Sequence, residues 1–259
     1  MRTQSTHPAR LLRATATTLM VVAAAACGSI DRATAPSPNA PTGTRTASSE
    51  VFVPVQPVVP CLDSIFKADF SADVLNAYPG APSIGTWTGN QSAGTIRVRG
   101  IVSPVVIKYA ALTQYAGLTG GVSLSGKIRC PSPASTGVVV VDWSSMVTSP
   151  TALFGAIVLR DDQSRILAAV EYRANGVVTY NGITVPGVTW AKDMVRRFRI
   201  RLDLTGHKSS LYVDGQLKLV SVPYFEASAA GLWRISMELG GTSAQTFVWA
   251  EVVAVRYAY

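Results

Sequence analysis

Histidine and cysteine are scarce in this chain of 259 residues, which has two histidines and three cysteines. Outside the first residues, the histidine is His207, in a stretch, Thr205–Lys208, that is typical of a turn. A Ser-His-Asp triad needs a histidine held by a carboxylate, and zinc sites need clustered cysteine and histidine. Neither arrangement is present in the sequence, nor is a glycine-rich phosphate loop. These absences argue against triad hydrolases, zinc enzymes and P-loop proteins.

Charged residues are also few, at 15%, whereas hydrophobic residues make up 48%. Disordered segments show the opposite balance, so most of the chain is expected to fold. The formal net charge of +8 includes Arg2, Arg10 and Arg13, which lie in a segment that we expect to be removed. Without them, 20 basic residues face 15 acidic ones, a net charge of +5. This excess is spread in ones and twos, so no nucleic-acid partner is expected.

The N-terminal segment lacks an apolar run of the roughly 20 residues that a membrane-spanning helix needs. A basic stretch up to Arg13 leads into the uncharged segment Ala14–Ala26, which is followed by Cys27 and Gly28. A basic start, a short apolar stretch and small residues are the marks of an export signal. The predicted divisions are a signal peptide at 1–26, a tether at 27–60 and a folded domain at 61–259.

The small residues before Cys27 resemble the lipobox of bacterial lipoproteins, in which the cysteine is acylated and becomes the first mature residue. The resemblance implies an outer-membrane-anchored protein of the cell envelope that meets the membrane through its lipid anchor only. An ordinary secretory signal cut near Ala26, which would leave the protein secreted, is the alternative. The proline-rich stretch that follows is predicted to be a semi-extended tether.

Cys61 and Cys130 are the remaining cysteines, an even pair in a chain that we expect to be exported. Exported proteins keep disulfides, so these two residues are predicted to form one. Two buried thiols are the alternative.

From residue 61 onward, short runs of alternating apolar and polar residues are separated by turn residues. In residues 197–204, Phe198, Ile200 and Leu202 alternate with arginines, which predicts a strand with one buried and one wet face. Asp214-Gly215 between two such runs predicts a tight hairpin. Short connections make the strands antiparallel, and about thirteen strands would divide into two packed sheets. The predicted fold class is therefore all-β, an antiparallel two-sheet β-sandwich (jelly roll) in a single domain.

Several of these stretches resemble the concanavalin A-like lectin/glucanase family, including its laminin-G-like members. They are Phe154–Tyr172, Trp190 followed by Arg197–Leu204, Leu211–Gly215 and the closing Phe247–Tyr257 strand. A strand at Phe66–Phe70 would pair with the closing one. The resemblance implies a sandwich that binds or cleaves carbohydrate.

Glucanases of this kind use two carboxylates about 5 to 9.5 Å apart. Same-face neighbours on a strand lie two residues apart, yet no two acidic residues of the domain have that spacing. A pair formed across strands, for example with Glu171, stays open. We therefore expect a non-catalytic carbohydrate-binding protein with a glycan as its partner. A subunit that binds another envelope protein is the first alternative, and a glycoside hydrolase is the second.

Sugar binding asks for exposed aromatic rings with planar polar groups beside them. The candidate residues are Trp87, Trp143, Arg160, Tyr180 and Asn181. Core packing is the alternative for each aromatic ring. Trp190, Trp233 and Trp249 flank clear strand patterns and are expected in the core.

Two further features are weaker candidates for ligand sites. Asp69, Asp73 and Glu251 are oxygen donors where the first and last strands are expected to meet, so they are candidates for a structural calcium ion. No other cofactor is expected. Arg197, Arg199 and Arg201 form one stripe on a wet strand face, which either is simply solvated or binds an acidic polysaccharide or lipopolysaccharide.

Overall fold

The computed structural model describes residues 63–102, 106–148, 155–241 and 245–258. For residues 101, 102, 106 and 245–252 it describes the backbone alone. All of these residues belong to one compact unit, Gln56–Tyr259. The predicted signal peptide, Cys27, the tether and Cys61 lie outside the described residues. Within the described part of the chain, no helix is long and apolar enough to cross a membrane.

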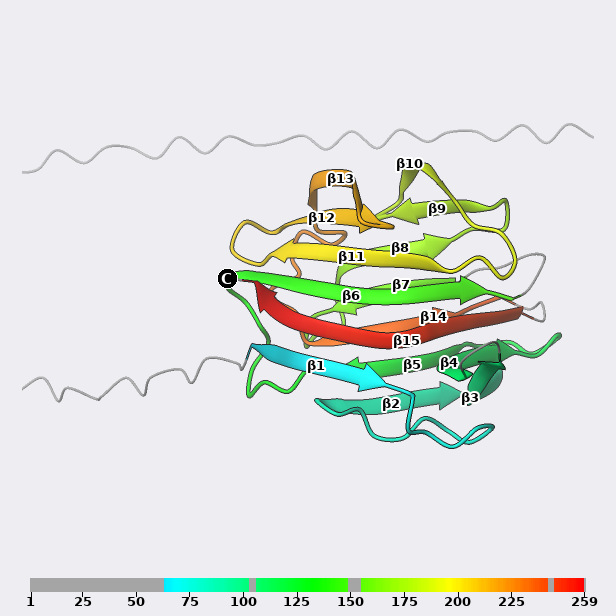
Figure 1. Ribbon diagram of the computed structural model, residues 1–259. Helices are drawn as coiled ribbons and strands as arrows, with labels where there is room; N and C mark the ends of the chain where they lie inside the picture. Colours follow the sequence, from blue (N-terminus) through cyan, green and yellow to red (C-terminus); the bar gives the residue numbers. More distant parts are fainter. Residues whose placement is uncertain (1–62, 103–105, 149–154, 242–244, 259) are drawn as a thin grey trace, which may run out of the picture. The chain divides into compact units, whose positions relative to one another are not determined.

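One of the two sheets has eight antiparallel strands, in the order β13-β12-β11-β6-β15-β4-β3, with β1 paired to β15 (Figure 1). The bounds are β1 (Ser64–Asp69), β3 (Gly94–Val102), β4 (Val106–Gln114), β6 (Val138–Val147), β11 (Arg196–Asp203), β12 (Lys208–Val213), β13 (Gln216–Pro223) and β15 (Gln245–Ala258). The expected pairing of the first strand with the last is confirmed.

The other sheet has seven antiparallel strands, in the order β10-β9-β8-β7-β14-β5-β2. They are β2 (Thr86–Gln91), β5 (Val122–Lys127), β7 (Gly155–Arg160), β8 (Ile166–Tyr172), β9 (Val177–Tyr180), β10 (Ile183–Thr189) and β14 (Arg234–Leu239). The predicted all-β, antiparallel two-sheet sandwich is therefore confirmed. The described residues form fifteen strands rather than about thirteen, and β2 lies where the sequence indicated an irregular Gly/Thr-rich stretch.

Local sequence explains the clearest elements. In β11 the residues Phe198, Ile200 and Leu202 are buried, while the arginines between them are exposed, as the alternation predicts. Asp214 and Gly215 join β12 to β13 with φ of 51° and 81°. Positive φ at both central residues defines the tight hairpin turn that matches the twist of the flanking strands. The predicted hairpin is confirmed.

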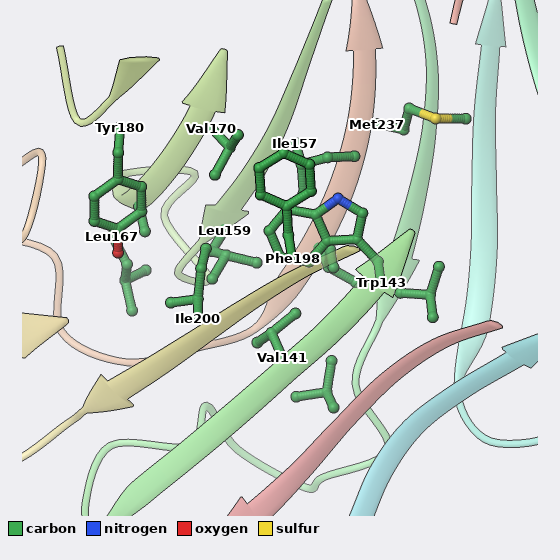
Figure 2. Close-up of a cluster of buried hydrophobic side chains, with 14 of the residues drawn as sticks. Val141, Trp143, Ile157, Leu159, Leu167, Val170, Tyr180, Phe198, Ile200 and Met237 are labelled. Carbon is green, nitrogen blue, oxygen red and sulfur yellow. The ribbon is translucent and has the colours of Figure 1, made fainter. Parts of the chain in front are cut away.

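The inner faces of the two sheets meet in a core of aliphatic and aromatic side chains (Figure 2). Trp143 of β6 stacks on Phe198 of β11, with ring centroids 5.3 Å apart. Tyr172 of β8 meets the edge of Phe198 from the opposite sheet, and its hydroxyl is hydrogen-bonded to that of Ser145. Burial raises the pKa of Tyr172, so this hydroxyl stays protonated. These three rings join the sheets at the middle of the sandwich.

Candidate ligand-binding faces

Two of the aromatic residues predicted to bind ligand lie in the core. Trp143 is 2% exposed and Tyr180 is completely buried (Figure 2). A ring that stacks on a sugar must present a face to solvent, so both predictions are wrong. Trp143 follows the outward-facing Asp142, and successive residues of a strand point to opposite faces.

Trp87 is half-buried and belongs to strand β2. Its ring stacks on Phe70 at a centroid distance of 6.0 Å and meets Phe66 edge-on at 5.3 Å. Its indole Nε1 donates a hydrogen bond of 2.6 Å to the carbonyl of Gly80. Both the ring face and the N–H group are thus used inside the protein. The prediction of an exposed binding ring is wrong here too, and core packing describes Trp87 better.

Asn181 has a structural task rather than a binding one. It adopts φ of 48° in the turn between β9 and β10, beside Gly182 at 78°. Its Oδ1 accepts a hydrogen bond from the backbone N–H of Ala169 at 2.9 Å, and its Nδ2 donates one to the carbonyl of Pro223 at 2.9 Å. The side chain is therefore engaged in holding the β9–β10 turn against β8 and the end of β13.

Arg160 is the predicted ligand-binding residue whose side chain lines a surface groove. It lies at the end of β7 and donates hydrogen bonds to Glu238 of β14 from Nε and Nη2, at 3.1 to 3.3 Å. The groove has a volume of about 370 Å³ and lies on the outer face of the seven-stranded sheet. We call it the polar groove, and its lining side chains are Thr88, Asn90, Ser123, Ser125, Arg160, Ser164, Arg234, Ser236 and Glu238.

Strand register arranges these polar groups in rows. Thr88 of β2 lies opposite Ser125 of β5, and Ser125 lies opposite Ser236 of β14. On its other side, Ser236 lies opposite Val158 of β7. One residue pair further along, Asn90 and Ser123 lead to Glu238. Neighbouring strands lie about 4.8 Å apart, so hydroxyl, amide and carboxylate groups follow one another across the sheet at that spacing.

Small side chains continue this outer face toward β8. Ala156, Val158 and Ala169 point away from the main core, yet each is 4% exposed or less. Longer side chains around them, including those of Arg160 and Glu238, rise above this level. These three small side chains are therefore covered by their neighbours and form no part of the groove lining.

The turn from β7 to β8 begins directly after Arg160. Asp161 is a buried carboxylate that accepts hydrogen bonds from the backbone of Gln163, Arg165 and Ala230, and from the side chain of Arg165 at 2.6 Å. Burial by itself would raise the pKa of Asp161, but the hydrogen bonds from Arg165 outweigh it and hold that pKa below its ordinary value. Asp161 therefore holds the β7–β8 turn in place.

Two carboxylates share this outer face across strands. Glu238 of β14 and Glu171 of β8 both pair with Ala156 of β7, from either side. Their backbones are thus two strand spacings apart, about 9.6 Å. Glu171 is paired with Arg173 and accepts a hydrogen bond of 2.8 Å from Thr179, while Glu238 is held by Arg160 and Ser236. Both carboxylates are thus committed to partners within the protein.

The outer face of the eight-stranded sheet carries a different set of groups. Arg197, Arg199 and Arg201 of β11 are exposed there as a stripe, as predicted. The register places Asp142 of β6 beside Arg199. Arg256 of β15 reaches the same carboxylate from the other side, and this cross-strand partner was not found from the sequence. We call these five residues the basic face.

Asp142 organises two of the four arginines. Its Oδ1 is 2.6 Å from Nε of Arg199, and its Oδ2 is 2.8 Å from Nη1 of Arg256. A depression of about 860 Å³ opens beside it, lined also by Ser144, Arg197, Tyr212 and Asp214. Asp214 is paired with Arg196 at 2.6 Å. Tyr212, which pairs with Arg199 across β11 and β12, brings a half-exposed aromatic ring to this depression.

The remaining sequence predictions have simpler outcomes. Asp69 and Asp73 each accept a backbone hydrogen bond, from Ser71 and Gly80, and the side chain of Glu251 lies outside the described residues. No group of three or more metal-ligating side chains occurs among the described residues, and the calcium site stays a prediction. His207 lies in the β11–β12 turn and stacks on Tyr224. Trp190 is in the core, and the side chain of Trp249 lies outside the described residues.

Comparison with known proteins gives no family assignment. No family model matches the sequence, and no curated protein matches it either. Similar solved structures include a Crh5 transglycosylase (16% identity, 77% of this chain and 86% of that one, TM-score 0.48). A sialidase (13%, 70% and 19%, 0.47) and a beta-glucanase catalytic domain from Podospora anserina (14%, 65% and 87%, 0.44) are others. This chain thus spans about a fifth of the sialidase, and at these TM-scores none of the likenesses carries an argument about function.

Proposed function

We propose that the protein is a non-catalytic carbohydrate-binding module of the concanavalin A-like kind, presented at the cell envelope. In this proposal Cys27 is acylated, residues 27–60 form the tether, and a Cys61–Cys130 disulfide secures the start of the domain. The observation that carries the binding role is the polar groove. Its rows of hydroxyl and amide groups run across the three neighbouring strands β2, β5 and β14, and the Arg160–Glu238 pair lies beside them.

Such rows suit the hydroxyl groups of a neutral sugar chain. Each hydroxyl of Ser123 and Ser125 both donates and accepts a hydrogen bond, and the bidentate Arg160–Glu238 pair offers a planar polar surface beside them. No exposed tryptophan supplies a stacking platform in the described groove, so the expected affinity is modest and depends on hydrogen bonds.

A glycan array probed with the full chain in detergent tests this proposal, followed by titration of the sugars that bind. The variant Ser123→Ala/Ser125→Ala removes two hydroxyls for which the structure shows no protein partner. It should weaken binding by about tenfold or more, because a hydrogen bond contributes about 1 kcal/mol. Ser132→Ala/Ser135→Ala, two exposed serines between β5 and β6 that lie outside both faces, is the matched control and should leave affinity unchanged. Equal losses in the two variants, or an array without any binding, would reject the proposal.

Non-catalytic binding is proposed because Glu171 and Glu238 are both engaged in ion pairs with arginines. Hydrolysis by a carboxylate pair needs one group to give a proton and the other to attack or activate water. Incubation of the chain with the sugars that bind on the array should release no reducing ends. Release that disappears in Glu238→Gln would instead assign a hydrolase.

The second candidate function is binding of another envelope protein. Leu217 and Val220 on the edge strand β13 are 51% and 66% exposed, and edge strands with apolar side chains are a common place for another chain to add. Cross-linking in cells separates the two candidates. A protein partner captured through position 220, with an array that shows no glycan, would favour this alternative.

The anchoring part of the proposal has its own tests. Labelling with radioactive palmitate should mark the wild-type chain and not Cys27→Ser, and an unlabelled wild type would reject the anchor. Mass spectrometry without reduction should find Cys61 linked to Cys130. Two free thiols would reject the bridge.

A further inference from the structure

The basic face carries an excess of charge that the fold itself does not use. Four arginines from β11 and β15 surround one carboxylate, that of Asp142. Asp142 neutralises at most one of them, although it contacts both Arg199 and Arg256. In the part of the chain that the structure describes, no acidic side chain pairs with the guanidinium of Arg197 or of Arg201. These two groups are exposed and stand on either side of Arg199.

The spacing of these arginines is fixed by regular sheet geometry. Residues two apart on a strand lie about 6.7 Å apart, so Arg197 and Arg201 are separated by about 13 Å along β11. Arg256 adds a cation two strands away, about 9.6 Å across the sheet, because Val140 of β6 pairs with both Arg201 and Arg256. The result is a patterned set of cations rather than a single charged point.

The chemistry of the groups indicates what they recognise. The guanidinium group is a planar fork of donors that matches carboxylates, and it is less strongly hydrated than an ammonium group. The depression beside Asp142 adds the half-exposed ring of Tyr212 and the hydroxyl of Ser144. An acidic sugar residue offers the matching groups, which are a carboxylate, hydroxyls and an apolar ring face.

We infer that the basic face is a second binding site, separate from the polar groove, and that it binds a carboxylate-bearing polysaccharide. Arg197 and Arg201 bind carboxylates of successive acidic residues in the chain. Asp142 holds Arg199 and Arg256 in place between them, and Tyr212 packs against a sugar ring in the depression. The site is on the opposite sheet from the polar groove, so one domain can hold a neutral and an acidic glycan at the same time.

Duplex DNA and an anionic membrane are the other polyanions that a basic surface attracts. A lipid surface is broad and cannot enter the depression beside Asp142. Single-stranded nucleic acid favours several exposed aromatic platforms. Of the aromatic residues that line the described depression, Trp143 and Phe198 are 2% exposed, and Tyr212 is half-exposed. The acidic polysaccharide therefore fits the observed groups best, and duplex DNA and an anionic lipid serve as competitors in the test.

The experiment measures retention of the full chain, in detergent at about 0.1 M salt, on immobilised polygalacturonate and on neutral dextran. We expect retention on polygalacturonate alone. Arg197→Gln/Arg201→Gln should weaken it about tenfold, because each lost charged hydrogen bond removes part of the binding free energy. Neither guanidinium has an acidic partner in the described structure, so the variant should fold normally, which circular dichroism and thermal unfolding check.

The matched control is Lys127→Gln/Arg129→Gln, which lowers the net charge equally but changes exposed residues outside both the basic face and the polar groove. It should retain wild-type affinity for polygalacturonate. An equal loss in this control would show that overall charge alone acts, and would overturn the inference. Elution by duplex DNA or by phosphatidylglycerol in mixed detergent micelles at lower concentrations than by free polygalacturonate would also overturn it. None of these outcomes bears on neutral-glycan binding by Ser123 and Ser125, so the two proposals fail separately.

Discussion

The two outer faces of the sandwich are built from the same strand geometry but differ in how charge is handled. On the seven-stranded sheet, Glu238 and Glu171 are each matched by an arginine. On the eight-stranded sheet, Asp142 contacts two of the four arginines of the basic face, and no acidic side chain in the described structure is paired with Arg197 or Arg201. The difference shows that the mild positive charge of the chain is concentrated by folding. It indicates hydrogen-bonding recognition on one face and electrostatic recognition on the other.

The largest difference between the two faces is expected in the free energy of unfolding, when the carboxylate that supports each face is replaced. Asp161→Asn removes the buried acceptor of the turn beside Arg160, and should lower the free energy of unfolding by about 3 kcal/mol, as expected for a broken buried ion pair. Asp142→Asn, the control on the other face, breaks exposed pairs and should cost below about 1 kcal/mol. Urea unfolding of the two variants measures both values. Equal costs would remove this distinction between the faces.

Asp161 also sets the direction of a pH effect. Its pKa is lowered in the folded state, so its contribution to stability is complete above the ordinary aspartate value of about 3.9. That contribution is lost as the pH falls through the lower, folded value. Wild type and Asp161→Asn should therefore converge in stability in strong acid. A difference that stays constant at all pH values would contradict this assignment.

The next largest difference is expected in how the salt concentration affects ligand binding at the two faces. Raising salt from 0.1 M to 1 M shortens the Debye length from about 10 Å to about 3 Å. Binding of polygalacturonate should fall by about tenfold or more, because exposed charges carry it. Binding of a neutral glycan at Ser123 and Ser125 should change little. Affinity measured by calorimetry for both ligands at both salt concentrations checks this, and a parallel decline would mean that one face binds both.

The smallest effect is expected from the centre of the basic face. Asp142→Asn frees Arg199 and Arg256 and should strengthen binding of polygalacturonate, by about threefold if the gain equals a typical exposed pair. If Asp142 matters more for holding the two arginines in place, affinity falls instead, and the arrangement rather than the charge is what counts. Glu238→Gln, which frees Arg160, is the comparison on the other face.

Much of the fold was predictable because it depends on local patterns. The alternation in residues 197–204 and the Asp214-Gly215 turn each specify one strand or one hairpin within a few residues. Trp143 was misjudged although a signal was present. Val139, Val141 and Trp143 alternate with the polar Asp142 and Ser144, which places the tryptophan on the buried face. Trp87 gave no such signal, because the residues around it are almost all small and polar.

The candidate sites depend on which residues of neighbouring strands lie opposite each other. This register cannot be read from a single sequence. Arg256 and Asp142 are 114 positions apart in the sequence, and they meet because β15 lies beside β6 in the sheet. Ser123, Ser236 and Thr88 form part of the polar groove only once β2, β5 and β14 are paired. Arg160 was found from the sequence as a polar residue at a strand end, but its partner Glu238 is 78 positions away.

The pairing of β1 with β15 has a mechanical consequence. A pull on the chain ahead of Ser64, with a glycan holding either outer face, is transmitted into the sandwich through β1. This strand pairs with β15 from Ser64 opposite Arg256 to Asp69 opposite Val252, and Lys67 adds a single bridge to Ile84. Tension along the strand loads several of these hydrogen bonds together instead of opening them one by one. Phe66 of the same strand packs edge-on against Trp87, which adds a further contact that must break before β1 is pulled away. The β1–β15 pairing is therefore expected to resist force applied to the start of the domain.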